Sequence, residues 1–125
     1  MSPHDVAFDV VFYAEDDGTK PVAVFLRSLE SNPDFAERIK SAIRRLKDGL
    51  WHRPPQTKAL GNGLYEARVL GQDGGRVIFF YDAYQRVVVV HAFQKKSQKI
   101  PADEIRTALD RKIRFQRRQE EGREK

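Results

Sequence analysis

The side chains that could do chemistry gather between residues 64 and 105, and most of them are cationic. They lie at the edges of three strand-like runs and in the segment after the last run, at Arg68, Arg76, Lys95, Lys96 and Lys99. Guanidinium and ammonium groups fixed around a sheet bind phosphate, and they can stabilise charge on a reacting phosphate without a metal ion. We therefore predict an RNA-binding sheet rather than a metal-dependent enzyme.

Two aromatic residues in these runs could stack on bases. Tyr65 lies in the first run and Phe93 ends the last, and base stacking on aromatic rings is a common mode of RNA recognition. Our hypothesis gives Arg76 and Arg68 the role of holding a phosphate. The alternative is that these cations are solvated rim residues in ordinary salt bridges, and that the lysine-rich segment is a solvated loop.

The three histidines form no pair for proton relay. His4 is near the first residue, His52 lies in a proline-containing loop, and His91 lies within VVVVHAF, where a hydrogen-bonded structural histidine is the favoured interpretation. The chain has no cysteine, no P-loop, no GxGxxG and no HExxH motif, and its turn carboxylates form no ligand set. We expect neither a metal nor a small-molecule cofactor.

Length and charge favour one small, basic domain. The chain has 125 residues, a net charge of +5 and a pI near 9.6, so its long-range field attracts polyanions. Its first residues lack a signal-peptide pattern, and no apolar run approaches the ~20 residues of a membrane helix. We expect a cytoplasmic protein with no membrane partner.

The apolar spacing predicts an α+β protein in the order β, α, α, β, β, β, α. The predicted strands cover 7–13, 64–69, 76–82 and 86–93, and the predicted helices begin near Pro21, Pro33 and Pro101. Asn32 is the expected cap of the second helix, Gly49 its expected C-cap, and 50–63 an expected loop. We expect the helices on one face of the sheet, one domain over 1–115, and a charged, disordered tail over 116–125.

Several phrases of the sequence resemble a known family. They are KPVAVFLRSLE, RRLKDG, GLYEARV, GRVIFFY and HAFQKKSQKIPADEI, and together they cover about residues 8 to 115. They resemble the phage-derived Gp49-like group of HigB-type toxins, within the wider RelE/ParE toxin superfamily. The resemblance implies a RelE-like fold: a small antiparallel β-sheet with an N-terminal helical hairpin and a C-terminal helix.

The resemblance also implies a function. It suggests the toxin of a type II toxin–antitoxin pair that cuts mRNA on the ribosome without a metal, with a helix-turn-helix antitoxin as partner. Catalytic residues of such toxins would correspond here to Arg76, Arg68, Lys95 and Lys96. The implied RNA contacts are Lys58, a looser match, together with Tyr65, Phe93 and Lys99.

Relatives differ in the residues that transfer protons. Some have a tyrosine or histidine near the C-terminus, and this chain has neither after His91. Two alternatives therefore stay open: a non-enzymatic inhibitor of gyrase, as ParE-like relatives are, or a non-catalytic module that binds nucleic acid or an antitoxin.

Overall fold

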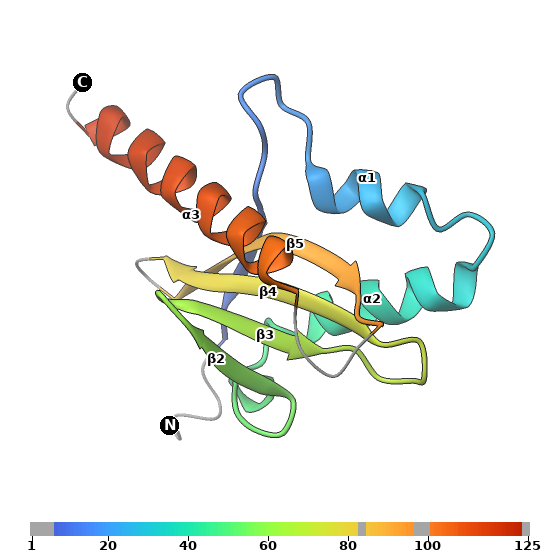
Figure 1. Cartoon of the computed structure of the whole chain (residues 1–125). Helices are drawn as coiled ribbons and strands as arrows, with labels where there is room; N and C mark the ends of the chain where they lie inside the picture. The colour runs from blue at the N-terminus through green and yellow to red at the C-terminus, as the bar shows by residue number, and fades with distance from the viewer. Residues whose placement is uncertain (1–6, 83–84, 97–100, 124–125) are drawn as a thin grey trace.

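A five-stranded sheet forms the centre of the molecule (Figure 1). The computed structural model describes residues 7–82, 85–96 and 101–123. The strand order is β1-β5-β4-β3-β2, with bounds β1 Asp9–Phe12, β2 Thr57–Gly61, β3 Leu64–Arg68, β4 Gly75–Asp82 and β5 Arg86–Gln94. Strands β3 to β5 pair antiparallel, as predicted, and β2 adds antiparallel to β3, whereas β1 pairs parallel with β5. The prediction of a purely antiparallel sheet was therefore wrong for β1.

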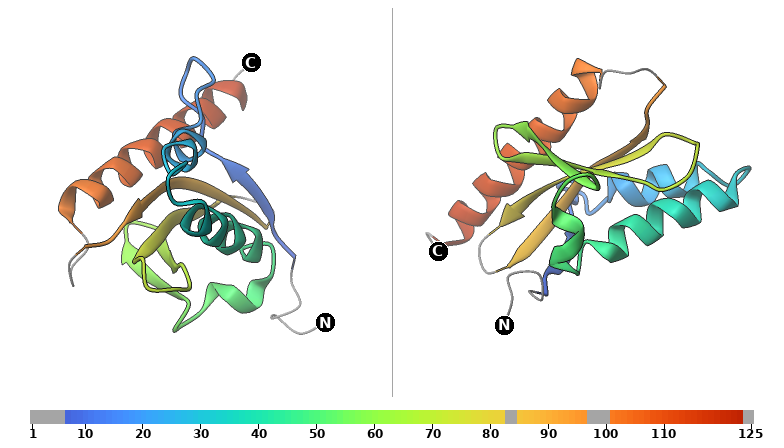
Figure 2. Two further views of the ribbon diagram at one scale, coloured as in Figure 1. Left: turned by 90° about the vertical axis from the view of Figure 1, so that its right-hand side faces the viewer. Right: turned by 90° about the horizontal axis from the view of Figure 1, so that it is seen from below.

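Helices cover both faces of this sheet (Figure 2). Helices α1 (Pro21–Arg27) and α2 (Pro33–Arg45) form a hairpin on one face, and α3 (Ala102–Arg123) crosses the other. The prediction that all helices lie on one face of the sheet was therefore wrong. In β4, Val77 and Phe79 pack under the hairpin while Ile78 and Phe80 pack under α3. Because β4 has apolar residues on both of its faces, both faces must be removed from water.

The start of α2 follows from local chemistry, as predicted. The Asn32 side chain accepts a hydrogen bond from the Phe35 backbone N–H, and Pro33 occupies the first turn, where a missing N–H has no cost. The predicted C-cap was wrong. The helix ends at Arg45, and Gly49 instead begins a short 3₁₀ helix, η2 (Gly49–His52).

Strand β2 lies inside the segment that was expected to be a loop. Prolines and glycines surround its sequence TKALG, which has only one β-branched residue, so the local pattern gave little indication of a strand. Its pairing with β3 is produced by the turn at Gly61, Asn62 and Gly63. All three have positive φ angles, of 94°, 57° and 76°, the geometry that a tight hairpin of this kind requires.

Helix α3 continues through most of the predicted disordered tail. The Arg118 guanidinium donates hydrogen bonds to the Ala14 carbonyl at 2.6 Å and to the Tyr13 hydroxyl at 3.0 Å, and it lies 3.3 Å from Asp16. These partners lie about a hundred residues earlier in the chain, so the charged composition after residue 116 did not indicate them. The predicted tail was therefore wrong as far as Arg123. No helix in the described part of the chain is long and apolar enough to cross a membrane.

We predict that Arg118→Ala loosens the C-terminal half of α3 without unfolding the sheet. Charge-assisted hydrogen bonds to a partly exposed side chain contribute about 1 kcal/mol here, so the free energy of local opening should fall by about that amount. Amide hydrogen exchange measures it residue by residue. Arg117→Ala is the matched control, because Arg117 is the exposed neighbour with the same charge. Equal exchange in the two variants would contradict this anchoring role.

Candidate nucleic-acid interface

The sheet face under α3 carries most of the predicted site residues. The strand register aligns Lys58, Glu66, Ile78 and His91 in one row across four strands, and aligns Arg68, Arg76 and Phe93 in the next row. Residues directly opposite one another in paired strands project to the same side of a sheet. Cations from β2, β3 and β4 are therefore gathered on a single face.

Arg76 is held by a carboxylate that the sequence analysis did not consider as a site residue. Its Nε donates to Glu66 Oε1 at 2.9 Å, and its Nη1 donates to the Gly75 carbonyl at 2.8 Å. The side chains of Arg76 and Glu66 are only 11% and 5% exposed. Removing such a pair from water is costly, so its net contribution to stability is small, whereas loss of one partner leaves a buried charge uncompensated.

The other predicted cations lie near the Glu66–Arg76 pair, on neighbouring strands or in the segment after β5. Arg68 is exposed and directly opposite Arg76, and Lys58 is exposed and directly opposite Glu66. The Lys95 backbone N–H donates to the Gly74 carbonyl at 2.7 Å, which fixes the start of the lysine-rich segment beside the start of β4. The structure thus brings together Arg68, Arg76 and the segment that begins with Lys95 and Lys96. The predicted residue Lys99 lies outside the described residues.

The two predicted aromatic residues are not placed together with Arg76. Tyr65 projects from the other face of the sheet, where its ring lies 5.9 Å from Phe79 and 5.0 Å from Tyr81. Phe93 is on the Arg76 face but is 5% exposed. Base stacking by either ring stays a prediction.

His91 lies in the same row as Glu66 and was interpreted from the sequence as structural. Its Nδ1 is 3.1 Å from Arg111 Nη1, and since arginine only donates, Nδ1 must accept and the neutral ring carries its proton on Nε2. Burial lowers the pKa of His91, and the adjacent Arg111 lowers it too, whereas Glu104, whose Oε1 is 3.3 Å from Nε2, raises it. The net pKa is below the ordinary value of a histidine.

A hollow lies next to the side chains of His91 and Arg111. It has a volume of about 450 Å³ and lies where β1 has left β5, between the start of α1 and α3. His91, Arg111 and Glu15 supply its titratable side chains, and Thr19 and Ser28 add two hydroxyl groups. No feature of the local sequence indicated this arrangement, because it depends on α3 crossing β5.

His52 belongs to a different environment from His91. Its Nε2 lies 2.6 Å from the Leu46 carbonyl, and its Nδ1 lies 2.8 Å from the Tyr81 hydroxyl. The carbonyl can only accept, so Nε2 donates and Nδ1 accepts from Tyr81. Burial lowers the pKa of His52 and, together with Tyr65, raises the pKa of Tyr81 to about 12. This pair is a structural hydrogen-bond network under the helical hairpin.

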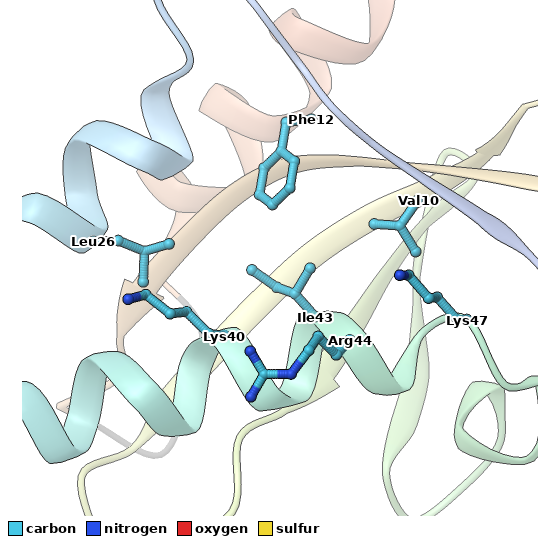
Figure 3. A pocket seen from close by; sticks show the side chains of 7 residues that line it. All are labelled: Val10, Phe12, Leu26, Lys40, Ile43, Arg44 and Lys47. Carbon is cyan, nitrogen blue, oxygen red and sulfur yellow. The ribbon is translucent and has the colours of Figure 1, made fainter.

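A second hollow, of about 270 Å³, lies on the hairpin face (Figure 3). Its apolar lining comes from β1, α1 and α2, and two cations of α2 with one from the segment after it complete the hollow, in the set Val10, Phe12, Leu26, Ile43, Lys40, Arg44 and Lys47. These three cations lie on the opposite side of the sheet from Arg76. They therefore do not add to the charge of the Arg76 face.

The Arg76 face can bind a polyanion but offers little to a metal ion. Within the described ranges there is no group of three or more His, Cys, Asp or Glu residues that could hold a metal. The chemistry available on this face is phosphate binding by arginine and lysine, together with one buried carboxylate and one neutral imidazole. Fold and face together define a small, basic α+β protein with cations gathered on one face of its sheet.

Comparison with known families identifies the group to which the chain belongs. Residues 25–113 match the model of the phage-derived protein Gp49-like family (DUF891), and the chain is a member of that family. Gp49-like proteins are in the RelE/HigB toxin superfamily, so the resemblance noted in the sequence is confirmed. Such toxins are typically paired with an antitoxin. No curated protein matches the chain.

We predict that Glu104→Gln lowers the pKa of His91 further. The carboxylate of Glu104 stabilises the protonated ring, and its removal leaves burial and Arg111, both of which favour the neutral ring. The pKa is measured from the ring-proton chemical shifts of His91 in an NMR titration. Asp103→Gln is the control, since Asp103 lies in the same first turn of α3 but pairs with Arg106. An unchanged or raised pKa in Glu104→Gln would contradict the assigned contact.

Proposed function

We propose that this protein is the toxin of a type II toxin–antitoxin pair and that it cleaves mRNA on the ribosome without a metal ion. The observation that carries the proposal is the convergence of Arg68, Arg76 and the Lys95–Lys96 segment at one end of one sheet face. Membership of the Gp49-like family supports the toxin class. We also assign the protein the RelE-like fold on its hairpin, sheet and C-terminal helix.

RNA supplies its own nucleophile, so the protein has to align the 2′-hydroxyl group, stabilise the charge on the phosphate and help protons move. The 2′-hydroxyl oxygen attacks the adjacent phosphorus, and negative charge grows on the phosphoryl oxygens as the transition state forms. Arg76, held in place by Glu66 and the Gly75 carbonyl, is a preorganised donor for that charge. Arg68, Lys95 and Lys96 add positive charge, and Lys58 extends the basic surface along the RNA backbone.

Two partners follow from this function. The substrate is mRNA in the ribosome, whose phosphates are attracted by the protein's positive charge. The second partner is a small helix-turn-helix antitoxin that neutralises the toxin. A phosphate contact by Lys99 completes the proposed RNA interface.

A second candidate function is non-enzymatic inhibition of gyrase. The observation that favours it is that Arg76 is already paired with a buried carboxylate, which reduces the positive charge available to a phosphate. A module that only binds nucleic acid or antitoxin is the third candidate. The three differ in what happens to mRNA and DNA after induction.

We predict that Arg76→Ala slows mRNA cleavage about 100-fold or more, the usual effect of removing one preorganised charge-stabilising donor. Mapping of mRNA 5′ ends in a translating extract measures the cuts and their codon phase. Arg27→Ala is the control, because Arg27 is an exposed arginine in the last turn of α1.

Each candidate gives a different result in this experiment. Codon-phased cuts that disappear in Arg76→Ala support the nuclease. Intact mRNA with a DNA-damage response in cells supports gyrase inhibition, and the absence of both effects supports a binding module. Equal cutting by Arg76→Ala and the native protein would exclude Arg76 as the main source of charge stabilisation.

A further inference from the structure

Buried polar atoms without partners are concentrated on the Arg76 face. In the described ranges, three buried side-chain polar atoms have no hydrogen-bond partner: Arg38 Nε, Glu66 Oε2 and His91 Nε2. Glu66 Oε2 and His91 Nε2 belong to the row that crosses β3, β4 and β5 beside Arg76, but Nε2 lies 3.3 Å from Glu104 Oε1, so Glu66 Oε2 is the observation that carries the argument. Such atoms are uncommon in folded proteins and are often explained by a catalytic or binding role.

The unpartnered oxygen of Glu66 is the harder of these two atoms to explain. Its side chain is 5% exposed, and only Oε1 is partnered, by Arg76 Nε at 2.9 Å. A carboxylate that served only to neutralise Arg76 would be better satisfied with both oxygens hydrogen-bonded, since desolvation of the ion is otherwise only partly offset. The unpartnered Oε2 therefore indicates that Glu66 has a role beyond its ion pair with Arg76.

We propose that Glu66 accepts the proton of the attacking 2′-hydroxyl group, an inference that rests on the proposed ribonuclease function. In this step the 2′-oxygen forms a bond to phosphorus, the bond from phosphorus to the 5′-oxygen breaks, and the 2′-hydroxyl proton moves to Glu66. Water protonates the departing 5′-oxygen. The products are a 2′,3′-cyclic phosphate and a 5′-hydroxyl, and Glu66 then returns its proton to solvent.

The other groups on this face are less suited to this step. Lys58, Arg68 and Arg76 are cations that stabilise charge. His91 accepts from Arg111 at Nδ1 and carries its proton on Nε2, so the neutral ring has no free lone pair for another proton. Glu104 lies beside His91 and is 27% exposed. Glu66 is the carboxylate in direct contact with the phosphate-binding arginine.

The pairing with Arg76 couples substrate binding to proton transfer. In the free protein Glu66 Oε2 is covered, and Arg76 occupies Oε1. Arg76 holds Glu66 Oε1 through Nε and the Gly75 carbonyl through Nη1, which leaves Nη2 to bind a phosphate while Oε2 accepts from the neighbouring 2′-hydroxyl. The arginine that binds the scissile phosphate thus also positions the base.

Single-turnover cleavage on programmed ribosomes tests this inference. The variants are Glu66→Gln, which keeps the shape and an acceptor for Arg76 but cannot take the proton, and Glu66→Asp, which keeps the carboxylate. Glu37→Gln is the control, because Glu37 is an exposed carboxylate that also pairs with an arginine, Arg44. Ribosome binding and thermal unfolding are measured on the same samples.

We expect Glu66→Gln to cleave about 100-fold more slowly, or slower still, with unchanged ribosome binding, as for removal of a general base. Glu66→Asp should retain a measurable rate.

The outcomes separate this inference from the proposed function. If the native protein cleaves and Glu66→Gln cleaves within about threefold of it, Glu66 only holds Arg76 and the inference fails. The inference also fails if Glu66→Gln loses ribosome binding in proportion to its loss of cleavage rate, because Glu66 then acts through binding alone. If Glu66→Gln does not fold, Glu66→Asp decides: its shortened carboxylate should slow cleavage without weakening ribosome binding, and an unchanged rate overturns the inference. A native protein that cuts no mRNA overturns both proposals.

Discussion

The burial of both faces of β4 and β5 is the constraint on which the rest of this structure depends. Alternate residues of β4 pack under the hairpin and under α3, and Val87, Val88, Val89 and Val90 of β5 are all fully buried. Two such strands can be removed from water only if a helix lies on each side. The ends of these strands, where the covering helices stop, are then the places where charged side chains can meet.

The Glu66–Arg76 pair lies near the start of β4 and places two charged side chains at positions of the sheet that are almost fully buried. The first residues of β4 would otherwise require apolar side chains, because Glu66 and Arg76 are almost as buried as the core. Placing an ion pair there contributes little to the free energy of unfolding, but it fixes the direction of one guanidinium. Rigid placement of charge is what stabilisation of a phosphoryl transition state needs, and it cannot be supplied by exposed lysines alone.

Local signals in the sequence were sufficient for the main elements. Asn32 and Pro33 define the start of α2, and the alternation in β4 correctly separated Arg76 and Ile78 from Val77 and Phe79. The errors arose where distant contacts decide the structure. The parallel partner of β1, the strand in 57–61 and the C-terminal half of α3 depend on pairing or on residues such as Tyr13, which no local pattern reveals.

The candidate site shows the same division. The cations were visible because lysine and arginine clusters stand out in a sequence, and the register does bring Arg68 and Arg76 together. Glu66 was not considered as a site residue, since a lone carboxylate among cations resembles a salt-bridge partner. The surroundings of His91 depend on Glu104 and Arg111, which reach it only because α3 crosses β5.

The parallel pairing of β1 with β5 has a consequence for how the chain folds. Hairpins β2–β3, β3–β4 and β4–β5 join neighbours in sequence, whereas Asp9 pairs with Arg86 across nearly the whole described chain. Closing so long a loop costs entropy that only later contacts offset, so the antiparallel strands should assemble first and β1 should add to their edge at a late step. Until then the outer edge of β5 is open, and the nascent toxin is vulnerable to strand exchange with another copy.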